Sequence, residues 1–411
     1  MTATPTHPRA PEDTKVLLLE GIHPLADQTL RAAGYQVTSR GGALDEDELI
    51  SALDGVHLLG IRSKTQVGER ALEAAPQLSA IGAFCIGTNQ IDVAGATSRG
   101  VAVFNAPFSN TRSVVELALA EIIALTRRLT EKDRAMHDGL WDKSADGLHE
   151  VRGRRLGIVG YGNIGAQLSV LAENLGMSVL FYDTADKLPL SMARPVSSLE
   201  ELLESVDIVT LHVDGRPGNS SMFGEAEFAR MRPGSIFLNL SRGFVVDQEA
   251  LRRHLESGHL SGAGLDVFPE EPKARGDEFR SPLRGLPNVI LTPHIGGSTE
   301  EAQQDIGRFV AGKLRDYTAS GNTSLSINFP TLTLPERSGE QRLVHVHRNT
   351  PGVLAAINGV FAAEKVNIES QYLGTRGEVG YVITDVGAGI APTALAALEQ
   401  LPETIRLRVL N

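Results

Sequence analysis

Residues 156–183 restrict the fold of this chain more than any other stretch. The segment begins with the short apolar run LGIVG, typical of a buried parallel strand, and continues into a GxGxxG pattern at Gly160, Gly162 and Gly165. Apolar residues at helical spacing follow, and a second apolar run ends in Asp183, 18 residues after the last glycine. Strand, glycine turn, helix, strand and terminal acid together predict a dinucleotide-binding unit.

Each part of this unit has its own role. Gly160 permits a tight turn, Gly162 lets the backbone approach a pyrophosphate, and Gly165 lets the helix pack close to the sheet. The N–H groups of Asn163 and Ile164 then lie at a helix N-terminus, where the helix dipole favours an anion.

Asp183 indicates which dinucleotide is bound. Its carboxylate can accept hydrogen bonds from the ribose hydroxyls and would repel a 2′-phosphate, so we expect NAD as the cofactor in preference to NADP.

Composition narrows the class of protein. A length of 411 residues indicates two or three domains, and the net charge of −11 argues against nucleic-acid or anionic-membrane partners. We expect no membrane span, no secretory signal, no metal and a disordered tail over residues 1–14. The only cysteine, Cys85, excludes an intrachain disulfide, fits a reducing cytoplasm and is expected to pack in an apolar setting.

Strand and helix patterns alternate over residues 15–108, which predicts a parallel sheet covered by helices. Arg62, Ser63 and Lys64 follow one of these strands. Ligands bind such sheets at the carboxyl ends of the strands, so we expect these residues to hold an anionic substrate.

Two helices are expected to connect the domains. Ser113 and Glu116 have the spacing of a capping box that opens a long apolar helix, and Ser298 and Glu301 have the same spacing before a helix over 299–319. We expect the second helix to cross back and complete the first domain. Trp141, in the polar loop GLWDKS, is interpreted either as a packing anchor or as a subunit or substrate contact.

After residue 339 the pattern changes to β-α-β-β-α-β, which is typical of a small ferredoxin-like domain. We expect residues 333–339 to be a linker. Within residues 340–411, two of the expected strands form an antiparallel pair around a turn near Gly377.

Three residues carry the expected chemistry, each after a strand of the dinucleotide-binding domain: Arg242, Glu271 and His294. Arg242 would anchor a substrate carboxylate and polarise the reacting carbon, because its planar fork suits a carboxylate. His294 would accept a proton in oxidation and donate it in reduction, and Glu271 would support it. Taken singly, each has an ordinary structural explanation; their joint placement favours catalysis.

The chain resembles the D-isomer-specific 2-hydroxyacid dehydrogenases, in particular bacterial members that act on 3-phosphoglycerate. The resemblance rests on GIRSKTQ, FCIGTNQID, FNAPFSNTRSVVEL, GIVGYGNIG, NLSRGFVVD, GLDVFPEEP and LTPHIGGSTEEAQ. It implies a Rossmann-type cofactor domain (109–296) inserted in a flavodoxin-like substrate domain (15–108 and 297–332). It also implies an ACT regulatory domain (340–411), for which RNTPGVL is the matching turn.

The resemblance also implies site residues. The catalytic set is Arg242, Glu271 and His294, and Arg62, Ser63 and Asn110 bind substrate. The residues implied to line the NAD site are those of the glycine turn together with Asn163, Ile164, Asp183, Leu240, Ser241, Arg242, Asp266, His294, Ile295, Gly296 and Gly297. His347, Asn349 and Asn367 would bind L-serine between paired domains, in a homotetramer; alternatively, His347 and Asn349 only cap a strand.

The expected activity is NAD-dependent oxidation of 3-phospho-D-glycerate to 3-phosphohydroxypyruvate, the first step of L-serine biosynthesis, with feedback inhibition by L-serine. Reduction of 2-oxoglutarate or another 2-oxo acid is the alternative within the family, and an NAD-sensing non-catalytic protein is the alternative outside enzymes. One position departs from the family: Gly41 stands where many relatives carry a basic residue, and Arg40 lies one place earlier. A one-residue shift at a strand end redirects the side chain.

Overall fold

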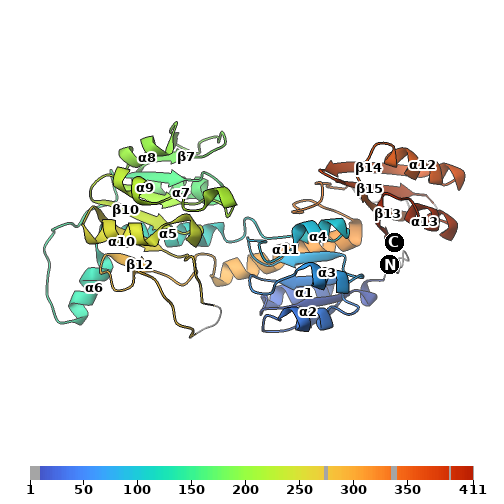
Figure 1. Cartoon of the computed structure of the whole chain (residues 1–411), viewed down its shortest axis with the longest axis horizontal. Helices are drawn as coiled ribbons and strands as arrows, with labels where there is room; N and C mark the ends of the chain where they lie inside the picture. Colours follow the sequence, from blue (N-terminus) through green and yellow to red (C-terminus); the bar gives the residue numbers. More distant parts are fainter. Residues whose placement is uncertain (1–9, 273–275, 335–339, 388–389, 411) are drawn as a thin grey trace. The chain divides into compact units, whose positions relative to one another are not determined.

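The computed structural model describes residues 10–272, 276–334, 340–387 and 390–410. The chain forms two compact units, one made of residues 1–109 and 303–411 and the other of residues 110–302 (Figure 1). Most of the expected tail (1–9) and most of the expected linker (335–339) lie outside the described residues; Pro11–Asp13 form a short 3₁₀ helix, η1.

The first unit contains a parallel five-stranded sheet in the order β2-β1-β3-β4-β5. This order is the flavodoxin-like one that the resemblance implies, and it confirms the parallel sheet expected from the alternating pattern. The strands are β1 (Lys15–Leu18), β2 (Gln36–Ser39), β3 (Leu58–Ile61), β4 (Ala80–Ala83) and β5 (Ala102–Phe104). The helices between them are α1 (Pro24–Ala32), α2 (Glu46–Ala52), α3 (Glu69–Ala74) and α4 (Val93–Ser98).

The long helix α11 (Glu300–Ser320) completes this sheet, as expected. Its buried residues Ile306, Val310 and Leu314 join the core that α1 forms on one face. Val310 lies so close to Gly82 of β4 that a Cβ there would collide with it, at 2.6 Å. The helices α2, α3 and α4 cover the other face.

The second unit is built on a parallel seven-stranded sheet in the order β12-β11-β10-β9-β6-β7-β8. The strands are β6 (Arg155–Val159), β7 (Ser178–Tyr182), β8 (Arg194–Pro195), β9 (Ile208–Leu211), β10 (Ser235–Asn239), β11 (Leu260–Leu265) and β12 (Val289–Leu291). The core on one face includes α5 (Thr111–Thr126) and α7 (Asn163–Asn174), and α8 (Leu199–Ser205), α9 (Glu225–Arg230) and α10 (Gln248–Glu256) cover the other. The remaining elements of this unit are α6 (Leu129–His137), η2 (Pro217–Asn219) and η3 (Gly243–Val245). Val245 of η3 is buried in the core that α8, α9 and α10 form.

An antiparallel sheet in the order β14-β15-β13-β16 forms the C-terminal part. Its elements are β13 (Gln341–Arg348), α12 (Val353–Ala363), β14 (Ile368–Arg376), β15 (Val379–Val386), α13 (Pro392–Glu399) and β16 (Thr404–Leu410), which confirms the β-α-β-β-α-β order. One face packs against α12 and α13. The other face contributes Val344, Tyr381 and Ile383 to the core around α11.

Both expected capping boxes are wrong. Helix α5 begins at Thr111 after Asn110, and the hydroxyl of Ser113 is instead 2.8 Å from that of Thr299. At the start of α11 the hydroxyl of Thr299, rather than Ser298, accepts the N–H of Ala302. In each case a neighbouring polar residue occupies the cap position, a shift that sequence spacing cannot resolve. Among the described helices, none is long and apolar enough to cross a bilayer.

Candidate active site

The glycine turn between β6 and α7 has the geometry that a pyrophosphate requires. Gly160 has a φ of 92°, and a Cβ there would lie 2.6 Å from the carbonyl oxygen of His212. At Gly165 a Cβ would collide with the carbonyl of Gly160, whereas at Gly162 no atom lies within 4 Å. Because α7 begins at Asn163, the N-terminus of this helix opens onto the free space at Gly162. The residues present therefore fit a dinucleotide.

Asp183 directly follows β7 and is fixed by two backbone donors. Its Oδ2 accepts the N–H of Tyr161 at 2.8 Å, and its Oδ1 accepts the N–H of Ala185 at 2.9 Å. The carboxylate thus lies beside the glycine turn. Each carboxylate oxygen has a second acceptor position, which leaves Asp183 able to bind ribose hydroxyls.

His294 and Glu271 form a hydrogen-bonded pair with 2.8 Å between Nδ1 and Oε2. The hydrogen bond from His294 to Glu271 raises the pKa of His294, burial opposes this, and the charges of Glu271 and Asp266 add to the rise. Burial alone would raise the pKa of Glu271, but the hydrogen bond and charge of His294 outweigh it and the pKa is lowered. The pair therefore favours an imidazolium beside a carboxylate.

Arg242 lies near this pair, since its charge acts on both His294 and Glu271. It follows β10, and its backbone carbonyl accepts a hydrogen bond from the Asn239 side chain at 2.9 Å. Its guanidinium donates to the carbonyl of Ser241 at 2.7 Å. The structure thus brings the three predicted catalytic residues to the carboxyl ends of neighbouring strands of one sheet.

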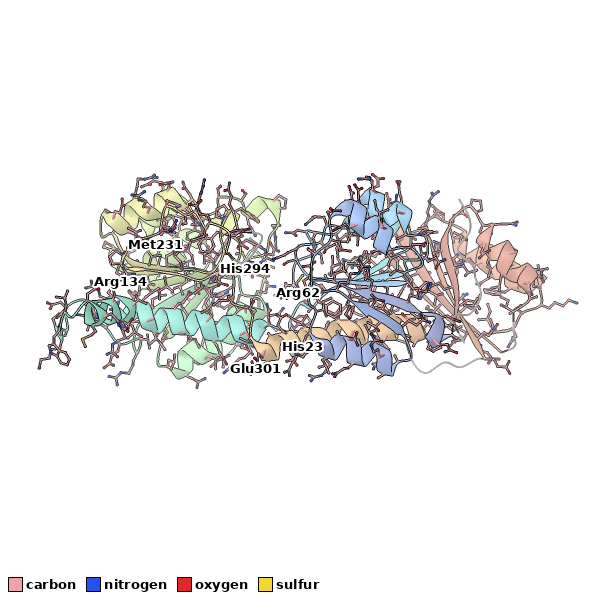
Figure 2. All side chains as sticks on the ribbon, turned by 90° about the horizontal axis from the view of Figure 1, so that it is seen from below. His23, Arg62, Arg134, Met231, His294 and Glu301 are labelled. Atoms are coloured by element: carbon pink, nitrogen blue, oxygen red, sulfur yellow. The ribbon has the colours of Figure 1, made fainter. Side chains whose placement is uncertain are left out.

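Asp266, expected in the NAD site, is buried and organises the segment that carries His294. Its Oδ1 accepts the hydroxyl of Thr292 at 2.6 Å and the N–H of Ile295 at 2.8 Å, and its Oδ2 accepts the N–H of Gly296 at 2.8 Å. These bonds fix the loop after β12, whose His294 is labelled in Figure 2. Nearby, the Ser241 hydroxyl donates to the side-chain oxygen of Asn239 at 2.8 Å.

The predicted substrate residues divide between the two units. Arg62, labelled in Figure 2, and Ser63 directly follow β3 in the first unit. Asn110 belongs to the second unit, where it precedes α5. Its Oδ1 is buried and has no hydrogen-bond partner among the described residues. Arg40 directly follows β2 and is exposed.

The predicted effector residues lie at two ends of the antiparallel sheet. His347 is opposite Gly380, and the Asn349 side chain donates to the carbonyl of Gly377 at 3.0 Å. Asn367 instead precedes β14, whose first residue is opposite Val386, six residues further along β15. At about 3.3 Å per residue this separates the two groups by about 20 Å within one copy of the chain.

Three residues with evident roles escaped the sequence analysis. Thr292 binds Asp266, as described above. Glu121 is buried in α5, 2% exposed, and a Cβ on Gly264 of β11 would lie 2.5 Å from its carboxylate. Gly380 accommodates the ring of His347, which a Cβ there would strike. Only Glu121 had a detectable signal, because it shares the helical face of Val114, Ala118 and Leu125.

Comparisons with known proteins place this geometry in a family. Residues 119–296 match the family model "D-isomer specific 2-hydroxyacid dehydrogenase, NAD binding domain", and residues 343–406 match an "AHAS small subunit-like ACT domain". The chain belongs to the D-isomer-specific 2-hydroxyacid dehydrogenase family, and NAD is its cofactor.

Curated relatives match nearly the whole chain. It is 51% identical to D-3-phosphoglycerate dehydrogenase of Haemophilus influenzae, over 96% of this chain and 97% of that one. It is 50% identical to the enzyme of the same name from Escherichia coli K12, with the same coverage. Among solved structures, D-2-hydroxyisocaproate dehydrogenase is 26% identical with a TM-score of 0.70, covering 77% of this chain and 100% of that chain.

Proposed function

We propose that this chain oxidises 3-phospho-D-glycerate to 3-phosphohydroxypyruvate with NAD, the first step of L-serine biosynthesis. The observation that carries the proposal is about 50% identity to curated D-3-phosphoglycerate dehydrogenases over almost the full length of both chains. The hydrogen-bonded pair of His294 and Glu271, with Arg242 near it, supplies the chemistry that such a reaction needs.

When bound, NAD would supply the hydride acceptor for the oxidation at C2 of the substrate. Arg242 binds the substrate carboxylate with its guanidinium and polarises the reacting carbon. His294 takes the hydroxyl proton during oxidation and returns it during reduction. Glu271 holds the His294 ring in one orientation through Nδ1 and stabilises the imidazolium that forms, so Nε2 is the atom that exchanges the proton.

The residues that hold the cofactor come from the ends of β6, β7, β10, β11 and β12. Asp183 would bind the ribose hydroxyls of the adenosine half, and the glycine turn with the start of α7 would bind the pyrophosphate. The remaining lining residues are Leu240, Ser241, Asp266, Ile295, Gly296 and Gly297, together with Arg242 and His294.

The distal anionic group of the substrate would be bound by Arg62 and Ser63, with Asn110 contributing its side-chain amide. Arg62 forms no ion pair with any described residue, so its charge is available. A phosphate and a carboxylate are both compatible with a guanidinium, and the relatives' names favour the phosphate.

The regulatory part would bind L-serine between two copies of the chain. His347 and Asn349 of one copy would meet Asn367 of another, because within one copy these residues lie at opposite ends of the sheet. We expect a homotetramer. Leu129, Met136, Leu140 and Trp141, on α6 and the loop after it, are exposed apolar side chains, with Trp141 78% exposed, and such groups are typical of subunit contacts.

The three-part division expected from the sequence remains part of this proposal: a substrate domain (15–108, 297–332), a cofactor domain (109–296) and an ACT domain (340–411). A cytoplasmic location also belongs to it, since a reduced Cys85 fits a reducing compartment.

The deciding experiment is NADH oxidation with 3-phosphohydroxypyruvate, with and without millimolar L-serine. Turnover that L-serine suppresses supports both the substrate and the effector. Turnover that L-serine does not suppress would exclude L-serine as the effector and would still support the substrate. Turnover with 2-oxoglutarate only would assign the chain to 2-oxo acid reduction, and no turnover with either would favour an NAD-sensing protein.

A further inference from the structure

The carboxylate of Glu20 is enclosed by the loop that carries Arg62. Glu20 follows β1, and its Oε1 accepts the backbone N–H of Arg62 at 3.2 Å and that of Thr65 at 2.8 Å. Its Oε2 accepts the N–H of Lys64 at 3.0 Å. The N–H groups of Arg62, Lys64 and Thr65 thus surround one anion. Backbone donors gathered in this way form the concave arrangement that proteins use to bind phosphates, and here a side chain of the protein occupies it.

The backbone of Glu20 is held in an unfavourable conformation. Its φ is 63°, in the left-handed region that non-glycine residues adopt at a cost of about 1 kcal/mol or more. Gly21 follows with a φ of 62°. The charge-assisted hydrogen bonds of the carboxylate offset this cost. A strained residue whose side chain organises a neighbouring loop is typical of a functional site.

The same turn also holds the end of β2. The N–H of Glu20 donates to the carbonyl of Gly42 at 3.0 Å, and the N–H of Gly21 donates to the carbonyl of Arg40 at 3.3 Å. Glu20 and Gly21 thus connect the two segments that carry Arg40 and Arg62. Neither guanidinium forms an ion pair with any part of the chain that the structure describes.

We propose that Glu20 is a positioning residue that sets the place of Arg62, and through it the preference for a substrate with a distal anionic group. This inference rests on the proposed function. Glu20 does not contact the substrate in this proposal; it fixes the loop backbone, which fixes where the Arg62 side chain begins. The Arg62 carbonyl is held from the other side by the side chain of Gln90, at 2.5 Å.

Glu20→Gln tests this with little change of shape. The amide keeps one acceptor oxygen but places an NH₂ group against a backbone N–H, so part of the loop loses its partner. The readout is kcat/KM for 3-phosphohydroxypyruvate against kcat/KM for hydroxypyruvate, which lacks the phosphate. We expect the first to fall by about 10–100-fold, mainly through KM, and the second to change by less than about threefold, because misplacing a binding group by about 1 Å has effects of this size.

Two controls separate positioning from general destabilisation. Glu46→Gln removes the same charge from the surface of the first unit, where Glu46 pairs with Arg70, and should leave the ratio of the two kcat/KM values unchanged. The double variant Glu20→Gln, Arg62→Ala should be no worse than Arg62→Ala alone, because Glu20 acts through Arg62.

Equal losses on both substrates, or additive losses in the double variant, would overturn the proposal and leave Glu20 a structural residue. The proposed function is decided separately by the wild-type enzyme. If the wild-type enzyme turns over 2-oxoglutarate and not 3-phosphohydroxypyruvate, the proposed function fails. The role of Glu20 is then decided by the ratio of kcat/KM for 2-oxoglutarate to kcat/KM for 2-oxobutyrate, which lacks the distal carboxylate.

Discussion

Glu271 holds the ring of His294 through Nδ1, with 2.8 Å between Nδ1 and Oε2, while its other oxygen accepts the N–H of Phe268 at 3.1 Å. His294 reaches this position from a left-handed backbone with a φ of 53°. The carboxylate is therefore held from both sides, and the ring has one hydrogen-bonded orientation. This relationship leaves Nε2 as the nitrogen that can face a substrate.

Replacing His294 by alanine should lower kcat by about 10²–10⁴-fold in both directions, the usual contribution of a general acid–base residue. The measurement is steady-state NADH turnover with saturating substrate. His137→Ala is the matched control, since His137 is exposed on α6. Near-normal turnover of His294→Ala would exclude the proton-transfer role.

Replacing Glu271 by glutamine should move the pH profile. The hydrogen bond from His294 to Glu271 raises the pKa of His294, so removing the carboxylate lowers that pKa. Reduction needs protonated His294, and its kcat/KM should begin to fall at lower pH than in wild type. The acid limb of oxidation should also move to lower pH. A limb that stays in place or moves upward would contradict the pairing.

Asp183→Asn should reduce the preference for NAD over NADP by about 10–100-fold, because the repulsion between the carboxylate and a 2′-phosphate is lost. Asparagine retains one oxygen for the N–H groups that Asp183 now accepts. The ratio of kcat/KM values for the two cofactors is the readout. If Asn and Asp give the same ratio, the charge of Asp183 has no part in the discrimination.

Glu121 should make stability depend on pH. Burial raises its pKa to about 8, with a further contribution from the charge of Asp266. The folded state therefore holds a proton that the unfolded state releases above its ordinary pKa, so the free energy of unfolding should fall as pH rises from about 5 to 8. The loss should be on the order of 3–5 kcal/mol.

Glu121→Gln should remove this dependence of the free energy of unfolding on pH. The measurement is denaturant unfolding of wild type and variant at several pH values. Glu116→Gln, on the same helix, removes an exposed carboxylate that pairs with Arg112 and should keep the wild-type slope. Parallel curves for wild type and Glu121→Gln would show that Glu121 is ionised in the folded protein.

Gly380→Ala should abolish or weaken inhibition by L-serine and leave uninhibited turnover intact. The new methyl group would strike the ring of His347, and such overpacking costs about 1–3 kcal/mol, so half-inhibition should need about tenfold more serine or beyond. Gly359→Ala is the control, because no atom lies within 4 Å of a Cβ there. Unchanged inhibition in Gly380→Ala would remove His347 from the effector site.

The strand and helix order could be predicted because the periodic patterns are long and regular. The GxGxxG turn, the alternation of strands and helices over residues 15–108 and the β-α-β-β-α-β order of the C-terminal part were all recognisable. The helix starts were less predictable, since Asn110 and Thr299 compete with Ser113 and Ser298 for the cap positions, and that competition is decided by tertiary contacts.

The site was predictable only where function depends on residue type at a fixed spacing. The glycines, Asp183 and the three proposed catalytic residues could be named because each has a residue type suited to its proposed role and follows a recognisable strand. Glu20, Thr292 and Gly380 could not, because each acts on a segment that is far from it along the chain, between 26 residues (Thr292 and Asp266) and 45 residues (Glu20 and Thr65) away. Only the folded sheet brings these partners together.

The two ends of the antiparallel sheet, with His347 at one and Asn367 at the other, have a consequence for how regulation responds to dilution. A lone protomer holds two incomplete halves of the proposed effector site. Inhibition by L-serine would then vanish at concentrations where the subunits separate. Assemblies made only of His347→Ala chains, or only of Asn367→Ala chains, should not respond to L-serine. Mixed assemblies of the two variants should regain inhibition, because His347 of an Asn367→Ala chain can then meet Asn367 of a His347→Ala chain.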